Sequence, residues 1–173
     1  GADNPPAYVT TFAHDRNVSG SASQWTRLRG YWRLEDGGYH GSGPGEVETY
    51  TGDIDWTDYA FSAHITPLIG AQHHINVRVQ GGQRGYAFGL SAEGVTLYKK
   101  TAGQYAALTS APFAWSVGQT YRLRVSVEGA RLSARVESAD GTAQTLTYED
   151  GDAPYLNGLV GLSAWGGGHL RCT

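Results

Sequence analysis

The sequence contains no methionine, a single cysteine and no long apolar run. The lone Cys172 cannot form a disulfide within the chain, so cysteine usage does not indicate a cellular compartment. No stretch approaches the roughly 18 apolar residues that a membrane-spanning helix needs, which argues against a membrane partner. The formal net charge of −3 argues against nucleic acid as a partner, because nucleic acid selects basic surfaces.

Helical periodicity is also missing, and period-two alternation takes its place. No segment combines ten or more residues with the 3.6-residue repeat of a helix. Short alternating runs instead lie between glycine-rich turns, in a chain of 173 residues with 25 glycines, 11 tyrosines and 5 tryptophans. About twelve strands are expected. We predict an all-β fold, a two-sheet antiparallel β-sandwich of the jelly-roll type.

The length suits one domain with a full core. Residues 1–7 are polar and contain paired prolines, so we expect a linker or tag arm there and a single β-sandwich domain over residues 8–173. The sequence has no initiating methionine and no signal peptide, and we expect a processed protein or an excised domain.

The most informative stretch, residues 73–90, reads HHINVRVQGGQRGYAFGL and predicts a hairpin. Its first strand has one apolar face, while the other face carries His74, Asn76, Arg78 and Gln80. These side chains offer both donors and acceptors, which suits a polar, neutral ligand. The alternative is a solvated sheet face on which Arg78 is the cross-strand partner of a glutamate.

A series of short motifs runs through nearly the whole chain. They are G-x-W-R-L-E-D-G from Gly30, W-T-D-Y from Trp56, V-R-V-Q from Val77, G-x-x-Y-R-L-R-V from Gly118 and G-x-V-G-L from Gly158. Their order resembles the concanavalin A-like (laminin-G-like) jelly-roll superfamily, and within it the family-66-type carbohydrate-binding modules appended to bacterial glycoside hydrolases.

The resemblance implies a non-catalytic sugar-binding module in a larger, secreted, glycan-active enzyme. It implies an extracellular protein that holds a terminal sugar, such as a fructofuranose or arabinofuranose, in a small pocket. It also implies a structural calcium ion. Two acidic loops carry suitable oxygen ligands, and we predict Asp150 and Asp152 as the metal ligands. The alternative for these loops is that Asp-Gly pairs form turns.

A sugar site needs an aromatic ring beside planar polar groups. Trp56 lies in a loop with Asp53 and Asp55, and Trp165 ends a strand on the face opposite its apolar residues. The predicted ligand-binding residues are Asp53, Asp55, Trp56, His74, Arg78, Tyr86 and Trp165.

Two other classes of function stay open. A jelly-roll glycoside hydrolase would use two carboxyls, for which Glu46 and Glu48 are candidates, and a polysaccharide lyase would use Arg78 and His74 with Tyr86 or Tyr98. A laminin-G-like adhesion domain would show an exposed apolar patch instead.

Overall fold

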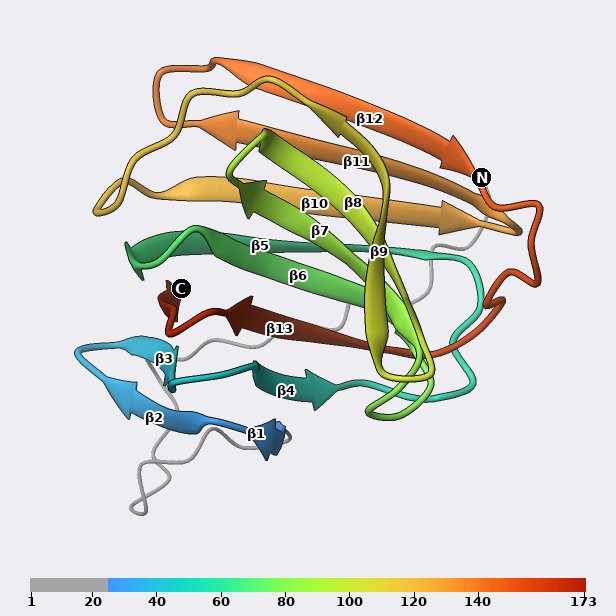
Figure 1. Cartoon of the computed structure of the whole chain (residues 1–173), viewed down its shortest axis with the longest axis horizontal. Helices are drawn as coiled ribbons and strands as arrows, with labels where there is room; N and C mark the ends of the chain where they lie inside the picture. The colour runs from blue at the N-terminus through green and yellow to red at the C-terminus, as the bar shows by residue number, and fades with distance from the viewer. Residues whose placement is uncertain (1–24) are drawn as a thin grey trace, which may run out of the picture.

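The computed structural model describes residues 25–173, so the predicted arm at residues 1–7 and the first part of the predicted domain, residues 8–24, lie outside the described residues. The described part has 14 strands and no helix. No helix in this part could cross a membrane. The strands form two antiparallel sheets of seven strands each (Figure 1). The predicted two-sheet antiparallel β-sandwich is thereby confirmed.

Both sheets are built from strands that are distant in sequence. In spatial order, sheet A contains β1 (Thr26–Arg29), β4 (Val47–Thr51), β13 (Leu159–Trp165), β6 (Gln72–Val79), β7 (Gly85–Ser91), β8 (Gly94–Thr101) and β9 (Gln104–Ala111). Sheet B contains β12 (Ala143–Glu149), β11 (Arg131–Ser138), β10 (Tyr121–Glu128), β5 (Tyr59–Ile69), β14 (His169–Cys172), β3 (Gly38–Ser42) and β2 (Tyr31–Glu35). The last two strands of the chain, β13 and β14, lie inside their sheets between strands from earlier in the sequence.

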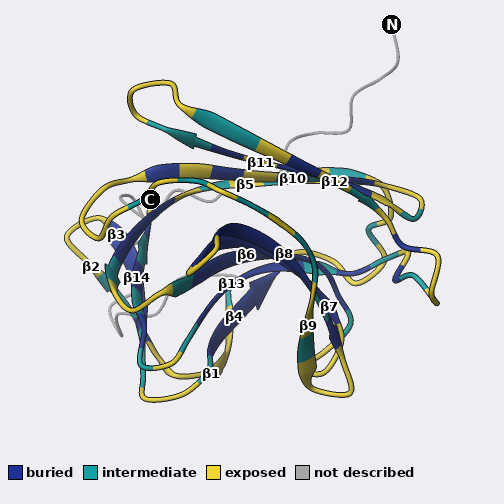
Figure 2. Cartoon of the chain, turned by 45° about the horizontal axis from the view of Figure 1, so that its top comes forward, coloured by how far each residue is buried: buried dark blue, intermediate teal, exposed yellow. Residues whose placement is uncertain are grey.

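The core lies between the two sheets, and strand alternation determines which residues enter it. Along β10, Leu123 and Val125 are fully buried while Arg122 and Arg124 are exposed. Figure 2 shows this alternation as blue and yellow bands along the strands of sheet B. Trp32 on β2 is 1% exposed, and its indole nitrogen donates to a backbone carbonyl at 2.9 Å. Burial of these apolar side chains contributes most of the stability of such a fold.

In sheet A, unlike sheet B, the residues of both faces are largely buried, including those that point away from the core. Every residue of β7 is buried, and so are most residues of β6 and β8 (Figure 2). The sheet curls until Lys100 on β8 lies 2.5 Å from Glu48 on β4. These strands are four positions apart in the sheet, which is about 19 Å if the sheet were flat. We call the face of sheet A that points away from sheet B the concave face.

The regular alternation of β6 breaks at Arg78. This residue has a left-handed backbone with φ of 51°, and the register opposite it on β13 shifts by one residue. Together these features mark a β-bulge. His74 and Asn76 share the concave face as the sequence predicted, but the bulge turns Arg78 out of that row.

We predict that Cys172, on the inner side of β14, does not react in the folded protein. Its side chain is 3% exposed, and burial raises the pKa of the thiol to about 12, so the reactive thiolate is absent at neutral pH. Titration with a chromogenic disulfide reagent should detect no thiol in native buffer and one thiol per chain in denaturant. Rapid reaction without denaturant would contradict the buried position of β14.

Candidate functional site

The concave face carries a cluster of aromatic rings at the end of β13. The indole centroid of Trp165 lies 4.4 Å from the ring of Tyr105 on β9 and 4.4 Å from the imidazole of His74 on β6. The ring of Tyr98 on β8 is 4.9 Å from the same indole. Trp165 and Tyr105 are partly exposed, whereas His74 and Tyr98 are buried. The curl of sheet A therefore assembles an aromatic corner from four strands, two of whose rings reach the surface.

Polar contacts hold the imidazole of His74 in place. Its Nδ1 atom lies 3.2 Å from the Ser163 hydroxyl, and its Nε2 atom lies 2.9 Å from the amide oxygen of Gln72. Tyr98 donates to the same amide oxygen at 3.0 Å. Because this oxygen only accepts, Nε2 carries the proton and Nδ1 accepts from Ser163. Burial, with a smaller contribution from His73, lowers the pKa of His74 to about 3, so the ring is neutral at physiological pH.

A cluster of charged side chains lies beside the aromatic corner. The Lys100 ammonium is 2.8 Å from Glu46 and 2.5 Å from Glu48, and it lies 4.8 Å from the Tyr105 ring centroid. The half-exposed guanidinium of Arg29 on β1 approaches Glu46 at 3.8 Å and Glu48 at 3.5 Å. Two carboxyls and two cations thus meet where β1, β4 and β8 face one another.

The pKa values of the two carboxyls in this cluster shift in opposite directions. Burial raises the pKa of Glu48 to about 7, and the adjacent Glu46 carboxyl adds to the increase. For Glu46, burial is outweighed by hydrogen bonds from Glu48 and Lys100, which hold its pKa below the usual range. Near neutral pH, Glu46 is therefore ionised while Glu48 is partly protonated and can donate as well as accept.

Two buried polar atoms of the concave face have no hydrogen-bond partner among the described residues. They are the Asn76 side-chain oxygen and the Trp165 indole nitrogen. Small residues flank Asn76, since its cross-strand neighbours are Gly161 and Ala87. Buried polar groups are rarely left without partners in folded proteins, so each such group needs an explanation. The polar groups of a ligand would satisfy both.

The predicted residues of the loop before β5 lie at the other end of the sandwich. Asp53 accepts from the Asp55 backbone at 2.9 Å, which closes a local turn. The ring of Trp56 covers Gly52, whose added Cβ would lie 2.4 Å from the indole. Strand β4 begins beside the end of β13 and runs away from it to this loop. The structure therefore does not bring Asp53, Asp55 and Trp56 together with Trp165.

Arg78 holds three loops together. Its guanidinium donates to the carbonyls of Thr57 at 2.9 Å, Gly129 at 2.6 Å and Tyr155 at 2.8 Å, and to the Asp58 carboxylate at 3.1 Å. The side chain is 1% exposed. Most of its donors are used within the protein. A role in ligand binding stays a prediction, and the contacts show a structural role.

Tyr86 points into the core face of sheet A and contacts the predicted metal ligand Asp150. Its hydroxyl donates to Asp150 at 2.6 Å, and the Lys99 ammonium lies 2.7 Å from the same carboxyl oxygen. Lys99 also donates to the carbonyls of Asp152 at 2.5 Å and Ala153 at 3.3 Å. The other Asp150 oxygen accepts from the Asp152 backbone at 3.0 Å.

This arrangement does not fit a calcium ion at Asp150 and Asp152. The positively charged nitrogen of Lys99 lies among the carboxylate and carbonyl oxygens that a calcium ion would need. Among residues 25–173, no group of three or more acidic, histidine or cysteine side chains could hold a metal. Calcium elsewhere in the chain stays a prediction.

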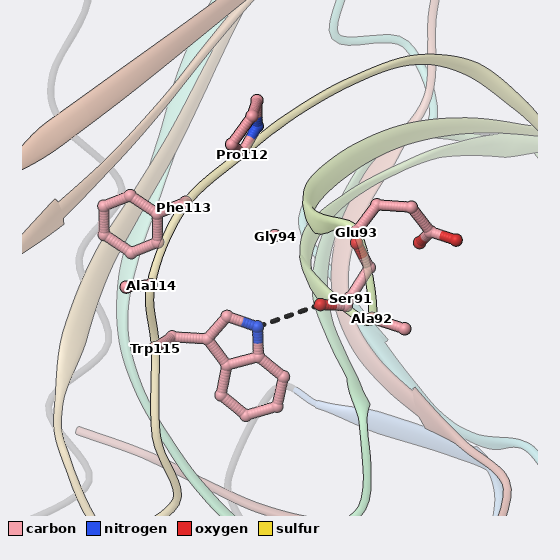
Figure 3. A pocket seen from close by; sticks show the side chains of 8 residues that line it. All are labelled: Ser91, Ala92, Glu93, Gly94, Pro112, Phe113, Ala114 and Trp115. Atoms are coloured by element: carbon pink, nitrogen blue, oxygen red, sulfur yellow. Dashed lines mark hydrogen bonds between the residues drawn. The ribbon is translucent and has the colours of Figure 1, made fainter.

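An open hollow lies at the rim of sheet A, between the β7–β8 turn and the segment after β9 (Figure 3). Glu93 lies on one side, and Phe113 and Trp115 lie on the other. The indole nitrogen of Trp115 donates to the Ser91 carbonyl at 2.9 Å. Trp115 therefore anchors its loop to the sheet, and the hollow is less suited than the concave face to hold a polar ligand.

Sequence reasoning named Trp165 and His74 as ligand-binding residues and placed Asn76 on the same strand face as His74, but it missed Lys100 and Tyr105 as members of the site. Alternation does place Tyr98 and Lys100 on one face of a strand. The contact between β8 and β4 depends on the curl of sheet A, which leaves no local signal in the sequence.

Several solved structures are similar to this fold. The chain is similar to a carbohydrate-binding module, CBM66, from Bacillus subtilis, with a TM-score of 0.74 and 19% identity over 86% of this chain and 91% of the module. The winged bean acidic lectin complexed with methyl-α-D-galactose gives a TM-score of 0.67 at 10% identity, over 93% of each chain. A xylan β-1,4-xylosidase from Bacillus halodurans gives 0.68 at 10% identity, over 98% of this chain and 40% of the enzyme.

At these identities the likeness shows the fold, and the chain has the concanavalin A-like jelly-roll fold. No protein-family model matches the sequence, and no curated protein matches it.

We predict that Arg78→Met destabilises the protein by about 3–5 kcal/mol, because several buried carbonyls lose their donor. Chemical denaturation gives the free energy of unfolding. Arg84→Met is the matched control, since Arg84 is exposed and its effect should stay within about 0.5 kcal/mol. Equal effects of the two substitutions would contradict the structural role of Arg78.

We predict that excess EDTA leaves the melting temperature unchanged, because Lys99 supplies the positive charge that Asp150 needs. Lys99→Met should instead lower the free energy of unfolding by about 3–5 kcal/mol, since it leaves a buried carboxylate without its cation. Thermal and chemical unfolding measure the two effects. A fall of more than about 3 °C with EDTA, reversed by calcium, would show that a calcium site exists.

Proposed function

We propose that this chain is a non-catalytic carbohydrate-binding domain that holds a sugar at the concave face of sheet A. The observation that carries the proposal is the unpaired set of Asn76 oxygen and Trp165 indole nitrogen beside a partly exposed aromatic corner. An aromatic ring can cover the apolar face of a sugar, and buried amide, indole and carboxyl groups can bind its hydroxyls. The similarity to a carbohydrate-binding module and to a lectin in complex with a galactoside supports this class.

The shape of the aromatic corner favours one sugar ring over a long chain. The Trp165 and Tyr105 rings are inclined by 47°, and the Trp165 and Tyr98 rings by 64°. Inclined rings form a corner, whereas a platform for several sugar units would need rings in one plane. This geometry supports the terminal residue of a glycan as the ligand. A furanose such as fructose or arabinose is the form implied by the resemblance to the family-66-type modules.

The two acids of the site support binding more than hydrolysis. Glycoside hydrolysis uses two carboxyls on opposite sides of the scissile bond. Here Glu46 and Glu48 bind the same Lys100 ammonium and hydrogen-bond to each other, so they lie on one side of any ligand. Such a pair can accept from neighbouring sugar hydroxyls while Arg29 and Lys100 balance its charge.

The wider setting of the domain is part of the proposal. We infer a module of a larger, secreted, glycan-active enzyme, with no nucleic-acid or membrane partner. The similarity to part of a xylosidase chain supports such an arrangement, because the match covers 40% of that enzyme.

Calorimetric titration against a panel of furanoses, pyranoses and oligosaccharides tests the proposal. We predict that one sugar binds saturably and that no product forms. Trp165→Ala should raise the dissociation constant at least tenfold, which corresponds to a loss of about 1.4 kcal/mol of binding free energy. Glu46→Gln should weaken binding as well, because Glu46 is the partly exposed acid of the cluster. Trp56→Ala is the matched control and should leave affinity within twofold, with circular dichroism confirming the fold of each variant.

Three outcomes would contradict this prediction in different ways. Absence of binding across the panel would contradict the function. Loss of affinity in Trp56→Ala alone would move the site to the loop with Asp53 and Asp55. Sugar release that Glu46→Gln and Glu48→Gln abolish would show a jelly-roll hydrolase instead.

A further inference from the structure

The outer face of sheet B, which points away from sheet A, carries a row of basic side chains across six neighbouring strands, β2 to β11. Cross-strand pairing places Arg33 beside His40, and His40 beside Arg171, which neighbours β5. On the other side of β5, His64 pairs with Arg122, and Arg124 pairs with Arg135. We call this set the arginine row: Arg33, His40, His64, Arg122, Arg124, Arg135 and Arg171.

The arginine row carries more positive charge than its neighbours balance. Its ion pairs are Arg33 with Glu35 at 3.3 Å and Arg135 with Glu137 at 3.6 Å. Arg122 and Arg124 are exposed and form no ion pair with any described residue. The chain as a whole has a formal charge of −3, so this face has the opposite sign to the rest of the molecule.

The pairing of Arg124 with Arg135 destabilises the isolated domain. Like charges directly opposite each other on neighbouring strands destabilise a sheet. On the same face, Glu137 lies opposite Arg122 and forms its ion pair with Arg135. Two further acids, Glu128 and Glu149, pair with Arg131 at the far end of the strands. Glu128 is four residues from Arg124, about 13 Å along the strand, and is too distant to form an ion pair with it. A bound anion would relieve this repulsion.

The other half of the row shows the same local excess of positive charge. The His40 and His169 rings approach to 3.0 Å between ring nitrogens, and the Arg33 guanidinium lies 3.4 Å from His169. Burial and the nearby Arg33 charge lower the pKa of both imidazoles. Both rings are therefore mostly neutral near pH 7, and Arg33 and Arg171 carry the positive charge of this half of the row.

We propose that the arginine row binds an acidic polysaccharide through its carboxylate or sulfate groups. The row spans about 24 Å, since neighbouring strands are about 4.8 Å apart, and this length suits an extended chain with repeated charges. Guanidinium groups bind carboxylates with two parallel hydrogen bonds. Duplex DNA carries a charge every 1.7 Å or so, and the net negative charge of the domain opposes so dense a polyanion. This site lies on the other sheet from the proposed sugar site and does not depend on it.

Affinity electrophoresis in gels that contain polygalacturonate tests the proposal at low salt. The variant Arg122→Gln/Arg124→Gln/Arg135→Gln removes the exposed centre of the row. The matched control Arg27→Gln/Arg84→Gln/Arg131→Gln removes the same charge from three exposed arginines outside the row. We expect the wild type to be retarded, the row variant to bind at least tenfold more weakly, and the control to stay within threefold. Salt should weaken wild-type binding more steeply than that of the row variant.

The variant Trp165→Ala separates this site from the concave face. Retardation by polygalacturonate should persist in Trp165→Ala even if that substitution abolishes binding of a neutral sugar. The proposal is overturned if polygalacturonate does not retard the wild type, if the row variant and its control lose affinity equally, or if Trp165→Ala abolishes the retardation. It is also overturned if a DNA duplex binds as tightly as polygalacturonate at the same salt concentration.

Discussion

The ion pairs of Lys100 with Glu48 on β4 and with Glu46, just before β4, connect opposite sides of the curled sheet A. They join strands that are four positions apart in the sheet. On the same concave face, the indole of Trp165 on β13 meets the ring of Tyr105 on β9. Burying a charge is costly unless it is paired, so the three groups depend on one another. The ion pairs that connect the two sides of the curled sheet are thus also part of the proposed site.

Alternation along β8 lets two adjacent lysines serve different parts of the fold. Lys100 points to the concave face and binds Glu46 and Glu48, whereas Lys99 points to the opposite side and binds Asp150. The first lysine joins β8 to β4, and the second anchors the loop after β12 to the sheet. Arg78 anchors neighbouring loops at the same end of the sandwich. Basic side chains therefore fix the loops at this end of the molecule without any need for a metal at Asp150.

The two outward faces of the sandwich differ in chemistry. The concave face of sheet A is aromatic and nearly balanced in charge, which suits a neutral sugar. The outer face of sheet B is more exposed and richer in arginine, and Arg122 and Arg124 are both exposed. Figure 2 shows that the strands of sheet B are flatter than those of sheet A. A single domain with both faces could hold the end of one glycan and the acidic stretch of another. The fold itself supports many functions, so these side chains carry the functional argument.

The sequence by itself determined the all-β class, the sandwich and the faces of individual strands. Period-two alternation depends only on local chain geometry, so it predicted that His74 and Asn76 share a face. The tertiary structure decided which strands meet, because β13 pairs with β4 and β6 through contacts far apart in the sequence. It also placed a bulge at Arg78 and curled sheet A, and these long-range features brought Lys100 to Glu48 and Tyr105 to Trp165.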